Sequence, residues 1–110
     1  MEQCPSVKKQ IRIDRRADKE IKKFPAQVQA KVDASLKILA RDGKLEEPFS
    51  KKLDDKLFEI RIKHQGQWRV LYTYFLEEAI IVLSAFHKKT QKTPFEELLK
   101  AQKRRKEYDV

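Results

Sequence analysis

Apolar residues in the first half of the chain recur at helical spacing. After Asp14, a residue type that caps helices, three apolar residues fall three or four positions apart, namely Ala17, Ile21 and Phe24. Pro25 separates this short helix from a longer one. The apolar stripe of the longer helix is formed by Val28, Val32, Leu36 and Leu39, and Gly43 supplies its C-terminal stop. The pattern predicts a helical hairpin that covers one face of a sheet.

The second half of the chain has the period of two that is typical of strands. From Leu57 to His64, one face is formed by Phe58, Ile60 and Ile62, and the other by Glu59, Arg61 and Lys63. A turn at Gln65-Gly66 leads to a second strand, Trp68 to Phe75, which is rich in aromatic and β-branched residues. Glu77-Glu78 marks the next turn, and Ile80 to Phe86 is almost entirely apolar, as in a strand covered on both faces. Three consecutive strands with short turns predict an antiparallel meander.

The remaining segments complete the expected fold. Val7 to Ile13 suits a short edge strand, and the charged segment from Lys44 to Lys56 suits a loop. Thr93, Pro94 and Glu96 form a capping box with proline at the first helical position. The helix that follows is expected to turn Phe95, Leu98 and Leu99 inward. We therefore expect an α+β fold, with two N-terminal helices packed on a twisted antiparallel sheet and a C-terminal helix, in a single domain over residues 1–110.

The charge of the chain narrows the choice of partners. Lysine and arginine number 26 against 17 acidic residues, a net charge of +9. Such an excess favours a polyanion: RNA, DNA, an anionic membrane or an acidic protein. No apolar run approaches the ~20 residues of a membrane span, and the N-terminus does not read as a signal peptide. The lone Cys4 fits a reducing compartment, so we expect a cytoplasmic protein with no membrane partner.

Several catalytic classes lack the residues they need. Cys4 lies near the terminus and Ser84 in an apolar strand, so neither is a persuasive nucleophile. The acidic residues occur mostly as adjacent pairs, whose side chains diverge, and the chain has only two histidines. We therefore expect no metal site and no cofactor.

A cluster of cations remains. The segment Phe86-His-Lys-Lys-Thr-Gln-Lys-Thr-Pro94 places three lysines and a histidine within seven residues, with no acid to neutralise them. Arg61 and Lys63 share one face of the first meander strand, and Arg69 lies just across the turn from them. If the middle strand pairs with both neighbours, these groups gather at one edge of the sheet.

Such a cluster suits RNA cleavage by the RNA's own 2′-hydroxyl. Arginine grips phosphate oxygens through a planar fork, and a lysine crowded by cations has a lowered pKa and can act as a base. Histidine can take or give a proton near neutral pH. The candidate catalytic residues are Arg61, Arg69, His87, Lys88 and Lys89, and Arg69 is expected to be exposed. The candidate RNA-binding residues are Lys63, His64, Lys92, Phe95, Lys103, Arg104 and Arg105.

Three segments carry a resemblance to a known family. They are Leu57-Phe-Glu-Ile-Arg-Ile-Lys63, Trp68-Arg-Val-Leu-Tyr72 and the lysine-rich segment from Phe86 to Pro94. Together they resemble the phage-derived Gp49-like proteins, a group that includes the HigB toxins within the RelE/ParE toxin superfamily. The similarity extends roughly from Pro25 to Tyr108 and is most specific in the lysine-rich segment.

The resemblance implies a RelE/HigB-like toxin of a type II toxin–antitoxin system. It implies a metal-independent endoribonuclease that cleaves mRNA on the 70S ribosome, and a helix-turn-helix, HigA-like antitoxin through which the complex binds operator DNA. Arg69 matches a strand arginine that contacts the scissile phosphate, and Arg61 matches a basic position on the preceding strand. Lys88 and Lys89 match cations after the last strand, and Phe95 lies near a position where some relatives have tyrosine.

The sequence departs from many close relatives at two positions, which have histidine where this chain has Ser84 and glutamine where it has His87. Two other functions stay open on the same fold. One is a ParE-like inhibitor of DNA gyrase, and the other is a noncatalytic module that binds RNA or protein. The cations after the third meander strand favour RNA cleavage, because a gyrase inhibitor needs no centre that activates phosphate.

Overall fold

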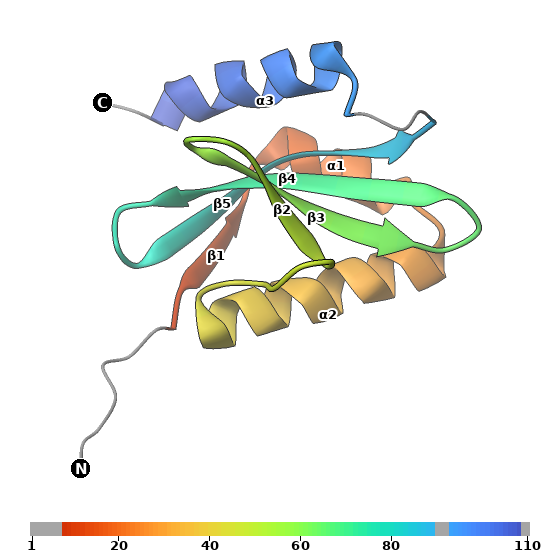
Figure 1. Cartoon of the computed structure of the whole chain (residues 1–110), viewed down its shortest axis with the longest axis horizontal. Helices are drawn as coiled ribbons and strands as arrows, with labels where there is room; N and C mark the ends of the chain where they lie inside the picture. Colours follow the sequence, from red (N-terminus) through yellow and green to blue (C-terminus); the bar gives the residue numbers. More distant parts are fainter. Residues whose placement is uncertain (1–7, 90–92, 109–110) are drawn as a thin grey trace.

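The computed structural model describes residues 8–89 and 93–108. Its elements, in chain order, are β1 (Gln10–Ile13), α1 (Arg15–Lys22), α2 (Ala26–Asp42), β2 (Ser50–Asp54), β3 (Leu57–Lys63), β4 (Gln67–Phe75), β5 (Ala79–Lys88) and α3 (Phe95–Tyr108). Figure 1 shows α2 and α3 on opposite sides of the sheet. The α+β fold expected from the sequence is confirmed. Cys4, Val7 and Lys92 lie outside the described residues.

The sheet has five strands in the order β1-β5-β4-β3-β2. The predicted meander of β3, β4 and β5 is antiparallel throughout. β1, however, pairs with β5 in parallel, so the expectation of a purely antiparallel sheet is wrong at this edge. The reason lies in the connection: the chain reaches the meander from β1 through two helices, and a helical crossover permits parallel pairing that a hairpin does not.

The segment from Lys44 to Lys56 is not wholly a loop, because it contains β2. Ser50, Lys51 and Lys52 pair with Ile60, Glu59 and Phe58 of β3, and the register shifts between Lys52 and Asp54. β2 was missed because its lysines are exposed and it has no apolar alternation. Lysines on an outer strand are a common protection against further strand pairing.

The helical hairpin packs on one face of the sheet, as predicted. All three apolar residues expected on α1 and all four expected on α2 are buried there. Opposite them lie Ile60, Ile62, Val70, Tyr72, Ile80, Val82 and Ala85. Asp14 caps α1 by accepting a hydrogen bond of 2.8 Å from the Arg16 backbone N–H. Hydrogen bonds from Arg16 and Tyr108 also hold the pKa of Asp14 well below its usual range.

The other face of the sheet is covered by α3. Its apolar contacts come from Ala101 and the partly buried Leu98 and Tyr108, against Leu57, Leu71, Ile81, Leu83 and Phe86. Phe95 and Leu99 are 70% and 46% exposed, so the expectation that they point inward is wrong. The Pro94 carbonyl accepts from the Glu97 and Leu98 N–H groups, and α3 begins at Phe95. Within the described residues, no helix is long and apolar enough to cross a bilayer.

Arg104 fastens α3 to α1 and β5. It is only 8% exposed, its two terminal nitrogens lie 3.1 Å from the carboxylate oxygens of Glu20, and Nη1 also donates to the Leu83 carbonyl at 2.8 Å. Burial raises the pKa of Glu20, but hydrogen bonds from Arg104, Ala85 and Lys100 outweigh it and lower the pKa. The structure does not support the expected RNA-binding role of Arg104, since its guanidinium is buried and already bonded to Glu20 and to the Leu83 carbonyl.

We expect Arg104→Ala to lower the free energy of unfolding by about 2–4 kcal/mol, because it leaves the Glu20 carboxylate without its main partner. The matched variant Lys103→Ala removes an exposed cation from the same helix and should change stability by less than about 0.5 kcal/mol. Since the pKa of Glu20 is depressed, the Arg104 contribution is present above the unfolded-state pKa and is lost as pH falls through the folded value. Urea unfolding at neutral and acid pH measures both effects. Equal free energies of unfolding for Arg104→Ala and the wild type at neutral pH would show that the Arg104 contacts do not stabilise the fold.

Candidate functional site

Three cations and one acid meet on the face of the sheet that α3 covers. Arg61 of β3 lies directly opposite Arg69 of β4, and Arg69 lies opposite Phe86 of β5. Opposed residues of antiparallel strands point to the same side, and residues two apart on a strand share a face. Glu59, Arg61, Arg69 and Lys88 therefore converge, and we call these four residues the cationic cluster. Of the groups that were expected to gather, Arg61, Arg69 and Lys88 are brought together.

Arg69 is the buried centre of the cationic cluster. It is 5% exposed, so the expectation of a surface arginine is wrong. Nη1 donates to the Trp68 carbonyl at 3.0 Å, whereas Nε lies 3.5 Å from Glu59 Oε1 and makes no hydrogen bond. Burial lowers the pKa of Arg69, although a guanidinium remains charged in proteins. The structure thus holds a buried cation whose counter-charge is the Glu59 carboxylate.

Glu59 was not among the residues predicted for the site, but it lies at the centre of the contacts there. It is 1% exposed, and its Oε1 lies 3.3 Å from Arg61 Nε. The Thr93 hydroxyl, expected to cap α3, instead donates to Glu59 Oε2 at 2.6 Å. The lysine-rich segment has no acid of its own, as the sequence showed, but Glu59 of β3 acts as a counter-charge to Lys88 as well as to Arg61 and Arg69. The signal was present in the alternation of β3, which places Glu59 on the face that carries Arg61 and Lys63.

The two lysines at the end of β5 differ in environment. Lys88 is 6% exposed, and burial together with Arg69 and Arg61 lowers its pKa, while Glu59 opposes the change. Lys89 is exposed at the end of the strand. Lys88 is thus the lysine suited to exchanging a proton, and Lys89 is suited to attracting an anion from solvent.

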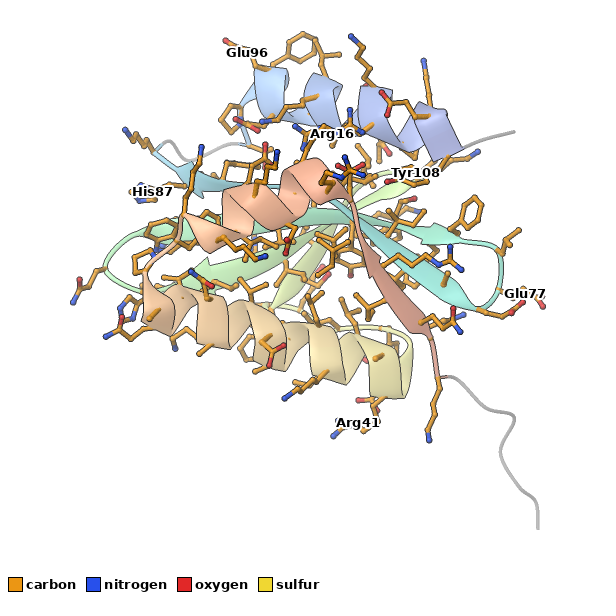
Figure 2. All side chains as sticks on the ribbon, turned by 180° about the vertical axis from the view of Figure 1, so that it is seen from behind. Arg16, Arg41, Glu77, His87, Glu96 and Tyr108 are labelled. Carbon is orange, nitrogen blue, oxygen red and sulfur yellow. The ribbon has the colours of Figure 1, made fainter. Side chains whose placement is uncertain are left out.

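His87 lies on the opposite face from Lys88. Its ring stacks on Trp68 with centroids 4.1 Å apart, and it lies at the margin of the molecule (Figure 2). Gly66, at a φ of 131°, approaches so closely that a Cβ there would lie 2.9 Å from His87 Nε2. The structure therefore does not bring His87 to the cationic cluster. The other histidine, His64, is half-buried in the β3–β4 turn, where its carbonyl accepts from Trp68 Nε1 at 2.9 Å.

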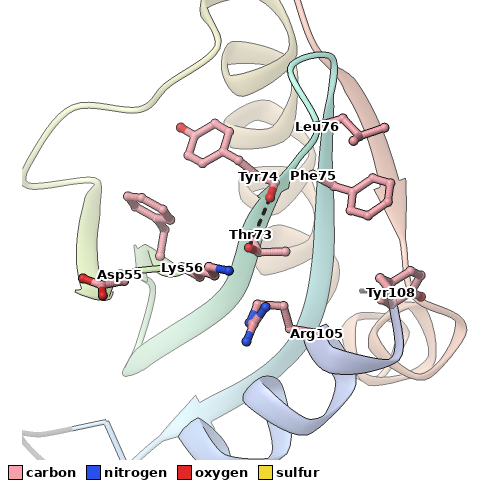
Figure 3. A pocket seen from close by; sticks show the side chains of 9 residues that line it. Asp55, Lys56, Thr73, Tyr74, Phe75, Leu76, Arg105 and Tyr108 are labelled. Atoms are coloured by element: carbon pink, nitrogen blue, oxygen red, sulfur yellow. Dashed lines mark hydrogen bonds between the residues drawn. The ribbon is translucent and has the colours of Figure 1, made fainter. Parts of the chain in front are cut away.

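The remaining candidate residues are dispersed. Lys63 is exposed at the end of β3, on the face of Arg61, and Phe95 and Lys103 are exposed on α3. Arg105 lines a cavity of about 690 Å³ at the opposite end of the sheet, together with Lys56, Thr73 and Asp55 (Figure 3). Arg105 therefore lies away from the cationic cluster. Within residues 8–89 and 93–108, no group of three or more histidines, cysteines or acids lies close enough to hold a metal ion.

A groove of about 590 Å³ adjoins the cationic cluster. Arg61, Lys63 and Arg69 line it, so both the strand edge and the buried arginine contribute to its wall. The cluster carries three positive charges against one negative charge and is fixed by strand pairing. Such an arrangement has the chemistry to bind an anion, and burial together with Arg69 and Arg61 lowers the pKa of its one lysine, Lys88.

A family model described as phage derived protein Gp49-like matches residues 19–106. The chain belongs to the Gp49-like family. This confirms the resemblance seen in the sequence and extends it toward the N-terminus to residue 19, within α1. No curated protein matches the chain.

Solved structures show that the Gp49-like chain has the fold of RelE. A doubly substituted Escherichia coli toxin RelE in the free state superposes with a TM-score of 0.69 at 18% identity, over 88% of this chain and 97% of that chain. The intact E. coli RelBE toxin–antitoxin complex gives 0.61 at 19% identity, over 74% and 99%. The RelBE2 toxin–antitoxin complex of Mycobacterium tuberculosis gives 0.57 at 20% identity, over 74% and 99%. At these identities the likeness establishes the fold.

Proposed function

We propose that this Gp49-like protein is the toxin of a toxin–antitoxin pair and inhibits translation by cleaving mRNA on the ribosome. The observation that carries the proposal is Arg69, a buried guanidinium whose Nε makes no hydrogen bond, held among Arg61 and Lys88. Three cations against the one carboxylate of Glu59 leave a net positive charge, which an RNA phosphate can compensate. The shared fold with the RelE toxins supports the same reading.

In the proposed reaction the RNA 2′-oxygen attacks the adjacent phosphorus, and the bond from phosphorus to the 5′-oxygen breaks. The 2′-hydroxyl loses a proton and the leaving oxygen gains one. Arg69 and Arg61 stabilise the negative charge that develops on the phosphoryl oxygens, a task assigned here to side chains rather than to a metal ion. Lys88, with its lowered pKa, is the candidate for proton exchange, while Lys63 and Lys89 attract the RNA backbone.

The proposal includes a protein partner. Two of the similar structures are toxin–antitoxin complexes, which supports a cognate antitoxin for this chain. We propose a HigA-like, helix-turn-helix antitoxin, which inhibits the toxin in the cytoplasm and carries the complex to operator DNA.

Mapping of transcript ends after induction tests the proposed activity. We expect new 5′-hydroxyl ends within translated mRNA, paired with 2′,3′-cyclic phosphate or 3′-phosphate ends, because the attacking oxygen comes from the RNA itself. The catalytically impaired Arg69→Lys variant is the matched control. Ends that carry 5′-phosphates would contradict the reaction, and DNA damage with intact mRNA would favour gyrase inhibition instead.

A further inference from the structure

The groove beside the cationic cluster lies where the edge of β3 loses its neighbour. Pairing of β2 with β3 reaches Ser50 opposite Ile60, and the Arg61 N–H then donates to the Phe49 carbonyl at 2.8 Å. Past this point Ile62 and Lys63 line the groove, and α2 and the segment before β2 form its other walls. Its volume of about 590 Å³ falls within the roughly 300–1,000 Å³ typical of small-molecule sites.

The groove has an apolar wall. Ile38, Leu45 and Phe49 contribute to it, and the Phe49 residue is 61% exposed. An isolated apolar residue at a surface is ordinary. Here the aromatic ring belongs to the lining of a concave site, where it offers a flat face for a planar group to stack on.

The same groove has a cationic lining. Lys31, Arg61, Lys63 and Arg69 contribute to it, and no lining residue is acidic. Arg69 is 95% buried, and its Nε makes no hydrogen bond but lies 3.5 Å from the Glu59 carboxylate. An anion in the groove would therefore meet a lining whose charged residues are all cations, Arg69 among them.

We propose that the groove binds one nucleotide of single-stranded RNA, with its phosphate at Arg61 and Arg69 and its base against Phe49. The inference rests on the proposed function and deepens it, because it assigns base recognition to a nucleotide next to the cleaved bond. A nucleotide combines the two properties that the groove offers, a planar face and an anion. The acidic side chains of a peptide match the charge but present no aromatic face to Phe49.

The test separates the base from the phosphate. The probes are a single-stranded pentanucleotide methylated at its ribose 2′-oxygens, which prevents cleavage, and an abasic ribose-phosphate oligomer of the same length. The wild-type protein should bind the base-containing probe roughly tenfold more tightly, the size of one base–aromatic stack. Phe49→Ala should reduce that ratio to about one and leave the affinity for the abasic probe unchanged. Phe49→Leu, which keeps an apolar side chain without a ring, should resemble Phe49→Ala.

Leu76→Ala is the control, because Leu76 is an exposed apolar residue at the opposite end of the sheet. It should preserve the wild-type ratio. In nuclear magnetic resonance spectra, cross-peaks from base protons to the Phe49 ring would support the inference directly. An unchanged ratio in Phe49→Ala would overturn it, as would contacts of Phe49 with an acidic peptide but not with RNA.

The proposed function has its own readout. Wild-type protein that leaves translated mRNA intact would overturn the proposed nuclease, whatever the binding ratios show. Wild-type cleavage that is retained, with the same base preference, by Phe49→Ala would overturn the nucleotide groove and leave the nuclease standing.

Discussion

Arg69→Lys should slow single-turnover RNA cleavage at saturating enzyme by about a hundred- to a thousandfold, the loss typical of removing one donor that stabilises transition-state charge. Lysine keeps the positive charge beside Glu59, so the acid retains a cation. Lysine lacks the planar guanidinium group, which can donate to a phosphate from two nitrogens while its third nitrogen faces the protein. The effect should therefore fall on the reaction step more than on RNA binding.

The matched control is Arg12→Lys, the same substitution at an exposed residue of β1. It should leave both the cleavage rate and the melting temperature unchanged. Because Arg69 is buried, thermal unfolding of Arg69→Lys is measured alongside the rate. A folded Arg69→Lys protein that cleaves at the wild-type rate would remove Arg69 from the proposed mechanism.

The elements predicted correctly are those that bury a continuous apolar face. The apolar stripes of α1 and α2 and the alternation of β3 mark the residues that are buried, so the positions of these three elements can be predicted from the spacing of apolar residues alone. β2 has no such apolar pattern, since Lys51 and Lys52 face solvent and the strand forms by pairing with β3. The parallel direction of β1 is likewise a property of the whole topology rather than of its own residues.

In the site, too, the features that depend on local spacing could be predicted and those that depend on distant contacts could not. A short turn at Gln65-Gly66 sets the pairing that places Arg61 opposite Arg69, so their proximity could be predicted. Strand alternation also places His87 and Lys88 on opposite faces of β5, and it places Glu59 on the same face of β3 as Arg61. Both consequences follow from the sequence, although neither was used to choose the residues of the site. Arg104 could not be assigned from sequence, because its partner Glu20 is distant along the chain. A run of basic residues does not show which member is buried.

Glu59→Gln should have two opposite effects on the proposed reaction. The substitution keeps the size of the side chain and removes the one negative charge of the cationic cluster. RNA phosphate no longer competes with a carboxylate for Arg61 and Arg69, so binding should tighten by at least about fivefold, equivalent to ~1 kcal/mol of charge interaction. Cleavage at saturation should slow by about a hundredfold, because the arginines lose the acid that holds them in position.

The protonation of Lys88 gives a readout that a purely structural role of Glu59 would not move. Burial, Arg69 and Arg61 lower the pKa of Lys88, and Glu59 acts in the opposite direction. Removing the Glu59 charge should therefore lower the pKa of Lys88 further, and the side chain should lose its positive charge at lower pH than in the wild type. Titration of Lys88 by nuclear magnetic resonance measures the shift, and the pH–rate profile should move in the same direction if Lys88 exchanges the proton.

The free energy of unfolding of Glu59→Gln should fall by about 3 kcal/mol, because the buried Arg69 loses its counter-charge. Glu59→Asp keeps the charge on a shorter side chain, so it should retain a Lys88 pKa close to that of the wild type while its cleavage remains slow. This pair of variants separates charge from position. Weaker RNA binding by Glu59→Gln, or an unchanged Lys88 pKa, would show that Glu59 does not compete with substrate for the cations of the cluster.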